Sequence, residues 1–130
     1  MEGIIQKLRF RNQERVAVIN APDTYLEQLA SAMPGSQCDN NIDQRFLYGF
    51  MIVFVKNIIE IRDLSPDVLH NLSADGILWF VYPKKSDINR DHGWEPLEVK
   101  GFKPVSKVAI DDEMSALRFR NVAFIKPRRT

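Results

Sequence analysis

The chain has 130 residues, with 18 Lys or Arg against 17 Asp or Glu, so its formal net charge is +1. This length suits one domain, and 45% apolar with 27% charged residues are ordinary values for a globular protein, which excludes intrinsic disorder. The balanced charge argues against a nucleic-acid or anionic-membrane binder, and the single cysteine excludes an internal disulfide and a zinc site of several thiolates.

Residues 15–20 predict a strand that is apolar nearly throughout, which is typical of burial on both faces. A turn over residues 21–23 follows it. Thr24 and Glu27 then fit a capping box, in which both side chains accept hydrogen bonds from free amides at a helix start. Apolar residues recur after it at helical spacing, namely Leu26, Leu29, Ala30 and Met33. Pro34-Gly35 ends this predicted helix.

A second strand–helix unit comes next. The polar residues 36–45 predict a loop or a stunted edge element, and residues 46–55 predict another buried strand. Residues 57–72 predict a helix that breaks and restarts at Ser65-Pro66, because proline favours the first position of a helix.

The remaining elements lead to a fold class. They are, in order, a turn at 74–76, a third buried strand at 77–82, a polar loop at 84–92, a short helix at 94–100, and two strands at 105–110 and 116–124. The last two strands flank Asp111-Asp112-Glu113 and form a hairpin. Three strand–helix units followed by two strands predict an α/β fold: a Rossmann-like three-layer sandwich, mostly parallel, with an antiparallel C-terminal strand pair.

We expect one α/β domain over residues 1–130, with an N-terminal leader at 1–14 and a frayed basic tail at 126–130. The motif Arg-Phe-Arg-Asn occurs at residues 9–12 and again at 118–121, and both copies fit strands with the phenylalanine inward. The longest apolar run, residues 46–55, is about half of what a membrane helix needs, and the N-terminus lacks a signal-peptide stretch. We therefore expect a bacterial-type cytoplasmic protein without a membrane partner.

Four segments of the sequence carry a family resemblance. They resemble a small bacterial family of unknown function. The two longer segments are Leu78-Trp79-Phe80-Val81-Tyr82-Pro83-Lys84-Lys85 and Ile110-Asp111-Asp112-Glu113-Met114-Ser115-Ala116-Leu117-Arg118-Phe119, and the two shorter ones are Lys7-Leu8-Arg9-Phe10 and Val18-Ile19-Asn20-Ala21-Pro22. Its members look like shortened relatives of the class I methyltransferase fold. The resemblance implies a fold and no activity.

The same resemblance allows the sequence to be checked for the residues that would bind a methyltransferase cofactor. A class I methyltransferase needs a glycine-rich turn after its first strand, so that the backbone can approach the cofactor. Here that turn is Asn20-Ala21-Pro22-Asp23, without a glycine. Only Asp39 or Asp43 is available as the acidic residue that would hold ribose hydroxyls. We therefore expect neither S-adenosylmethionine nor any other cofactor.

A binding site is expected beyond the carboxyl ends of the parallel strands, where open α/β sheets bind ligands. Free amides at a helix start, positive charge and hydroxyls come together there in two segments: Pro22, Asp23 and Thr24, and Lys84, Lys85 and Ser86. Together they would hold a phosphate or carboxylate. The alternative is that Thr24 is only a cap and the lysines are solvated, and Asp23 weakens the anion site by its charge.

The sequence offers few candidate catalytic or metal-binding residues. Asp91-His92 near Trp94 is the one cluster that resembles an acid–base pair, but no nucleophile accompanies it, so we assign no catalytic residue. His70 and His92 lack paired ligand spacing, and the acidic residues 111–113 do not match a calcium loop, so we predict no metal site. Cys38 has no activating base beside it in sequence.

Two functions stay open. The first is a non-catalytic Rossmann-like binding or interaction module, whose partner is a protein or a second copy of the chain; exposure of Trp94, Phe102 and Met114 on one face would support it. The alternative is a small-anion or nucleotide binder, possibly an enzyme, at the rim described above. A nucleic-acid partner would need the terminal segments to gather Arg9, Arg11, Arg118, Arg120, Arg128 and Arg129 into a basic stripe, and we do not expect one.

Overall fold

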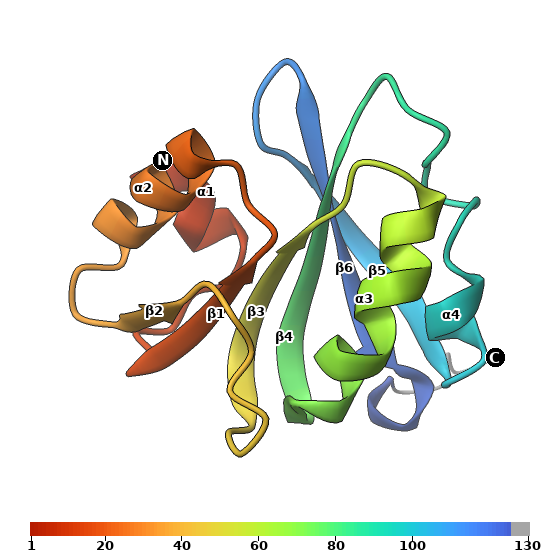
Figure 1. Cartoon of the computed structure of the whole chain (residues 1–130), viewed down its shortest axis with the longest axis horizontal. Helices are drawn as coiled ribbons and strands as arrows, with labels where there is room; N and C mark the ends of the chain where they lie inside the picture. The colour runs from red at the N-terminus through yellow and green to blue at the C-terminus, as the bar shows by residue number, and fades with distance from the viewer. Residues whose placement is uncertain (126–130) are drawn as a thin grey trace, which may run out of the picture.

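The computed structural model describes residues 1–125; the predicted basic tail at 126–130 lies outside the described residues. One six-stranded sheet runs through the molecule (Figure 1). Its strands are β1 (Arg15–Ile19), β2 (Gln37–Asp39), β3 (Tyr48–Phe54), β4 (Leu72–Pro83), β5 (Phe102–Ala109) and β6 (Met114–Asn121). The helices are α1 (Glu2–Lys7), α2 (Asp23–Ala32), α3 (Ile58–His70), α4 (Glu95–Glu98) and the short 3-10 helix η1 (Val122–Phe124).

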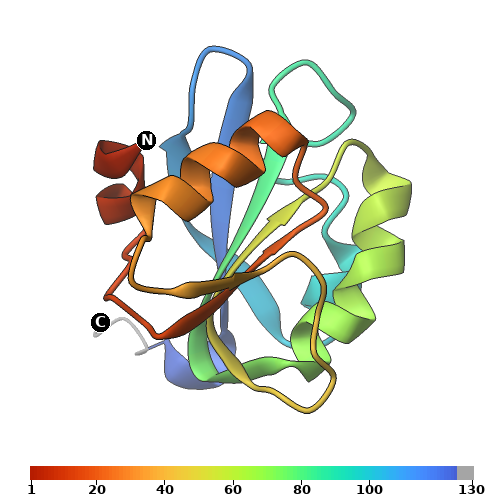
Figure 2. The same cartoon turned by 60° about the vertical axis from the view of Figure 1, so that its left-hand side comes forward.

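The predicted fold class is confirmed. The strand order is β2-β1-β3-β4-β6-β5, in which β2, β1, β3 and β4 are parallel and the last two are antiparallel. Helices α1 and α2 cover one face of the sheet and α3 and α4 the other, as Figure 2 shows for α2 in front of the strands. None of the helices in residues 1–125 has both the length and the apolar character to cross a bilayer.

The sheet separates two apolar layers. Along β3, alternate side chains enter opposite layers: Phe50 and Ile52 face α2, whereas Met51 and Val53 face α3. This alternation follows from the two-residue period of a strand, and it explains why a strand covered on both faces is apolar throughout.

The predicted capping box at Thr24 is wrong. Helix α2 begins two residues earlier than predicted, with Pro22 as its N-cap and no side-chain hydrogen bond at the cap. The extended backbone of Pro22 (φ −57°, ψ 148°) leads directly into Asp23, so Thr24 is already the second helical residue. From there its hydroxyl does not take the N-cap role.

The predicted break at Ser65-Pro66 is also wrong, because α3 continues through Pro66. Proline removes the hydrogen bond to the carbonyl of Arg62, but both residues lie on the exposed side of the helix, where water can replace that bond. The helix start is fixed by Asn57, whose side chain accepts a 3.0 Å hydrogen bond from the amide of Glu60.

The predicted turn at 74–76 lies inside β4 as an irregularity. The register with β3 jumps from Tyr48↔Leu72 to Phe50↔Ile77, so β4 carries extra residues there. A side chain at Gly76 would meet Leu72 Cδ1 at 2.8 Å and the Tyr48 carbonyl oxygen at 2.9 Å, so the packing requires glycine. Asp75 (φ 51°) binds the guanidinium of Arg120 through two 2.7 Å hydrogen bonds.

The first Arg-Phe-Arg-Asn copy is not a strand, contrary to the prediction. Residues 1–14 contain α1, and the chain then turns with positive φ at Arg9 (66°) and Asn12 (58°). Phe10 packs edge-on against Phe50 at a centroid distance of 5.6 Å, above the sheet instead of within it. The second copy lies in β6 with Phe119 buried, as predicted, although that strand ends at Asn121 and not at Phe124.

The three side chains whose exposure on one face would support an interaction module are not exposed together. Trp94 is 1% exposed and packs against Phe80, Tyr82 and Phe119, and its Nε1 donates to the Asn89 carbonyl at 2.6 Å. Phe102 and Met114 are partly buried against the apolar layers on opposite faces of the sheet. These three side chains therefore contribute to the core and do not form a shared docking surface.

We expect Trp94→Ala to lower the free energy of unfolding by about 3–5 kcal/mol, because it leaves a large cavity beside the sheet. Urea denaturation checks this value. Val99→Ala serves as the control in the same segment, since Val99 is 78% exposed and its loss changes stability by less than about 0.5 kcal/mol. Equal effects of the two substitutions would show that Trp94 is not a core residue.

Candidate functional site

The carboxyl ends of β1, β3 and β4 meet at one edge of the sheet, at the top of Figure 1. The turn between β5 and β6 and the loop after β4 rise above this edge. All six residues predicted as a binding rim follow the ends of β1 or β4, so they belong to this edge.

The turn after β1 is fastened to β3 by one side chain. Asn20 has a positive φ of 61°, and its Nδ2 donates to the Phe54 carbonyl at 2.8 Å and to Glu60 Oε1 at 3.2 Å. Glu60 Oε1 also accepts a 2.7 Å hydrogen bond from the amide of Lys56. The ends of β1 and β3 and the start of α3 are thus joined by polar contacts among themselves.

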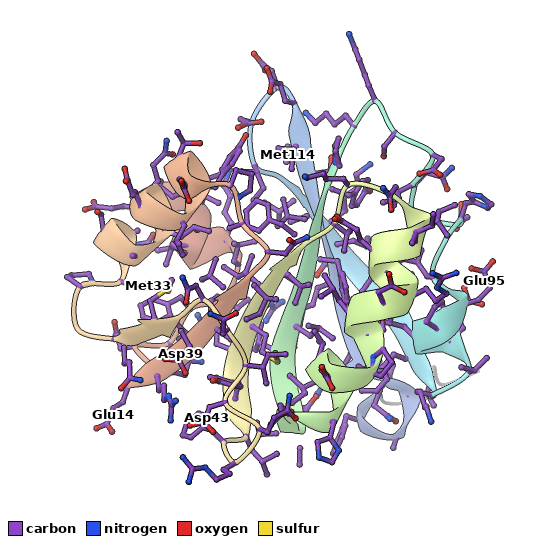
Figure 3. All side chains as sticks on the ribbon, in the orientation of Figure 1. Glu14, Met33, Asp39, Asp43, Glu95 and Met114 are labelled. Atoms are coloured by element: carbon purple, nitrogen blue, oxygen red, sulfur yellow. The ribbon has the colours of Figure 1, made fainter. Side chains whose placement is uncertain are left out.

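Asp39 ends β2, but it lies well below this edge. It pairs with Ala17 in the middle of β1, two residues short of the end of that strand. Figure 3 shows Asp39 and Asp43 beside β2 and the β2–β3 connection, and Met114 at the opposite, upper edge.

Arg15 binds both carboxylates, Asp39 at 2.7 Å and Asp43 at 3.0 Å, and its guanidinium lies 4.5 Å from the centroid of the Phe46 ring. The Tyr48 hydroxyl donates to Asp39 at 2.5 Å. Burial alone would raise the pKa of Asp39, but hydrogen bonds from Tyr48 and other donors outweigh it and hold that pKa below its usual value. These contacts connect the short edge strand β2 to β1 and β3.

The two lysines of the predicted rim share a cavity with acidic residues. Lys84 and Lys85 line a cavity of about 710 Å³ together with Pro83, Asp112, Glu113 and Met114. Pro22, Asp23 and Thr24 are not among its lining residues.

Ser86 is used by its own loop. Its hydroxyl donates to the Pro83 carbonyl at 2.7 Å and accepts from the Ile88 amide at 3.2 Å. Both contacts shape the loop after β4, and they leave the hydroxyl committed to local structure.

The turn at 111–113 is tied to α2. The Tyr25 hydroxyl donates to Asp111 Oδ2 at 2.5 Å, and the other oxygen of Asp111 accepts from the amides of Glu113 and Met114. Burial, reinforced by Asp111, raises the pKa of Tyr25 to about 12. The hydrogen bond from Tyr25 is the main cause that lowers the pKa of Asp111. This long-range contact had no signal in the sequence.

The other candidate residues lie apart from this edge or lack partners for chemistry. Asp91 and His92 are exposed in the loop after β4. Burial, followed by the nearby charge of Asp39, raises the pKa of the Cys38 thiol, which disfavours the reactive thiolate. Within residues 1–125, no group of three or more His, Cys, Asp or Glu side chains has metal-binding geometry.

Comparisons with known proteins support the fold alone. No family model matches the chain, and no curated protein matches its sequence. Among solved structures, a fibrillarin/Nop5p complex superposes with a TM-score of 0.62 at 12% identity, over 92% of this chain and 79% of the other. A ribosomal protein L11 methylase from Lactobacillus delbrueckii subsp. bulgaricus gives 0.56 at 14% identity, over 92% and 77%.

A tRNA m1G37 methyltransferase from M. jannaschii gives a TM-score of 0.53 at 11% identity, over 92% of this chain but only 47% of its own length. The chain therefore has the architecture of class I S-adenosylmethionine-dependent methyltransferases, at identities too low to transfer an activity.

The residues at the edge do not fit the cofactor that this architecture implies. Where a glycine-rich turn would let the backbone approach the cofactor, Asn20 carries a side chain bonded to Phe54 and Glu60. Asp39, the acidic residue at the end of β2, is held by Arg15 and Tyr48 below the edge. Neither group is free for S-adenosylmethionine.

We expect the free energy of unfolding to fall as the pH is lowered below about 4. The pKa values of Asp39 and Asp43 are lower in the folded chain than the unfolded value of about 3.9, so their stabilisation is present above that value and disappears as they protonate. Urea denaturation at several pH values checks this. Asp39→Asn should make the decline shallower, whereas Asp63→Asn, an exposed control on α3, should not.

Proposed function

We propose that this protein is a non-catalytic binding module that uses a methyltransferase-like scaffold without its cofactor. The observation that carries the proposal is the Asn20 side chain, which bonds the end of β1 to the Phe54 carbonyl and to Glu60. It stands in the turn where a cofactor of this architecture would meet the backbone.

Binding of S-adenosylmethionine would require this network to open. Moving Asn20 away would break its contacts with the Phe54 carbonyl and with Glu60, which are half-buried and exposed respectively, and a typical hydrogen bond contributes about 0.5–1.5 kcal/mol. The cofactor would also have to compete with Arg15 for Asp39. Both costs oppose binding before any contact with the cofactor is made.

The arrangement of candidate catalytic groups also supports a non-catalytic role. Asp91 and His92 are exposed, and the hydroxyl of Ser86, close by in the sequence, is committed to its own loop. We propose a cytoplasmic protein whose partner is another protein or a second copy of the chain. We also propose that the chain is related to the small bacterial family of unknown function that its sequence motifs resemble.

A small-anion or nucleotide site at the rim is the second candidate function. The 710 Å³ cavity lined by Lys84 and Lys85 favours it, whereas Asp112 and Glu113 in the same lining oppose it. On this alternative, Asp23 and Thr24 would contribute helix-terminal amides.

We expect the rim variant Lys84→Ala/Lys85→Ala to abolish any thermal shift caused by nucleoside phosphates, if the alternative is correct. A lysine pair lost from an anion site removes the main attraction for phosphate. Differential scanning fluorimetry of both proteins, with circular dichroism to confirm folding, makes the measurement. Undiminished binding by the folded double variant would place the ligand elsewhere.

We expect S-adenosylmethionine and S-adenosylhomocysteine at 1 mM to leave the melting temperature of the wild-type chain unchanged within 1 °C. A ligand present at about a hundred times its Kd adds about 2.7 kcal/mol of stability, which would raise the midpoint by several degrees. Isothermal titration calorimetry with the same compounds provides the second readout.

A micromolar Kd for either compound would contradict the proposal. Asn20→Gly then shows whether the Asn20 side chain is the obstacle, because this variant should bind more tightly than the wild type.

Sedimentation velocity of the same preparation tests the homodimer, since a dimer would exceed the 15.0 kDa of one chain.

A further inference from the structure

One tyrosine differs from the other two. The hydroxyls of Tyr25 and Tyr48 each donate to a carboxylate at 2.5 Å. Tyr82, near the end of β4, is 2% exposed, and its hydroxyl has no hydrogen-bond partner within residues 1–125. A buried phenol without a partner is unfavourable, since its hydrogen bonds to water are lost and nothing replaces them.

The Tyr82 hydroxyl is a donor without an acceptor. Burial raises the pKa of Tyr82, and the positive charge of Arg90 lowers it by less, so the phenol stays protonated at neutral pH. An oxyanion is the acceptor that gives such a donor its strongest hydrogen bond.

A cavity of about 400 Å³ adjoins Tyr82. Tyr82 on β4 is in register with Ser115 on β6, which is in register with Ala109 on β5, so the three form one row across the sheet. All three residues line the cavity together with Ile88, on the face of the sheet that carries α3 and α4. The lining thus combines two hydroxyl-bearing side chains and the polar Asn89 with the apolar side chains of Ile88 and Ala109.

The cavity is flanked by positive charge. Lys84 and Lys107 both line it, and neither forms an ion pair within residues 1–125. Arg90 is near enough to influence Tyr82 electrostatically. Lys84 also lines the rim cavity with Asp112 and Glu113, and its charge helps to lower the pKa of Asp111, a carboxylate that Tyr25 binds toward α2.

We propose that this cavity, beneath Lys84 and Lys107 and beside Tyr82 and Ser115, binds a small phosphate monoester. The lysines supply charge for a dianion, the Tyr82 hydroxyl supplies a hydrogen bond, and Ile88 with Ala109 contacts the organic part. A volume of about 400 Å³ lies in the range of small-molecule sites. Because the hydroxyl is sealed from solvent, the ligand enters by displacing exposed lining side chains.

This site is distinct from the predicted rim and independent of the proposed function. It lies on the α3 and α4 side of β4, whereas the rim cavity includes Met114, which packs on the α2 side. Lys84 lines both cavities, but Lys107 lines only the first and Lys85 only the second. Substitutions of these two lysines therefore separate the sites.

Isothermal titration calorimetry with inorganic phosphate and with ribose 5-phosphate tests the proposal on the full chain. We expect both to bind, with ribose 5-phosphate tighter because its sugar fills more of the cavity and can reach the polar side chains of Asn89 and Ser115, and citrate to bind more weakly than either. Tyr82→Phe should weaken phosphate binding at least tenfold, the loss of one hydrogen bond to a charged acceptor. Without ligand, its melting temperature should equal or exceed that of the wild type, since an unpaired donor is removed.

Matched controls make the result specific. Tyr48→Phe removes the same atom from a tyrosine that is paired with Asp39, away from this cavity, so it should lower the melting temperature and leave phosphate affinity unchanged. Lys107→Gln should weaken binding about tenfold or more, whereas Lys103→Gln on the same strand should not. The proposal is overturned if the wild type binds neither phosphate, if citrate binds and phosphate does not, or if Lys85→Gln abolishes binding and Lys107→Gln leaves it intact.

Discussion

Three parallel strands, β1, β3 and β4, are buried on both faces, and the rest of the molecule follows from this constraint. A polar side chain in such a strand costs several kcal/mol unless it finds a partner, so the strands are apolar and helices must cover both faces. Chemistry is thereby confined to the strand ends and to the edges of the sheet. Every candidate site in this protein lies where a buried strand stops.

At the carboxyl edge, the polar groups mostly satisfy one another. Asn20 joins β1 to β3, Ser86 closes its own loop, and Asp111 holds Tyr25. The methyltransferase-like architecture persists although the groups that would receive its cofactor are engaged in these contacts. Fold and activity are separable, because the sheet is stabilised mainly by its buried apolar faces and its backbone hydrogen bonds, whereas cofactor binding depends on a few unobstructed positions. The unpaired hydroxyl of Tyr82 is an exception in this pattern.

Much of the fold could be predicted, because burial leaves a periodic trace in the sequence. The strands at residues 15–19 and 48–54 and the antiparallel pair after Gly101 all match their apolar patterns. Predictions about single residues failed where solvent exposure decided the outcome. Pro66 does not break α3, because its side of the helix faces water. Exposure of Trp94 would have supported a partner-binding face, but this side chain packs in the core against Phe80 and Phe119.

The sequence by itself determined most of the alternation of strands and helices after residue 14, the absence of a glycine-rich first turn, and the small number of candidate catalytic groups; it did not determine helix α1 or the order of the strands in the sheet. Only the tertiary structure decided which polar groups meet. Tyr25 and Asp111 are 86 residues apart, and Arg120 lies 45 residues from Asp75. Periodicity reports whether a side chain faces the core, but a hydrogen bond depends on distance and direction between segments that only the folded chain brings together. For that reason the tie at Asn20 and the lone hydroxyl of Tyr82 became visible only in three dimensions.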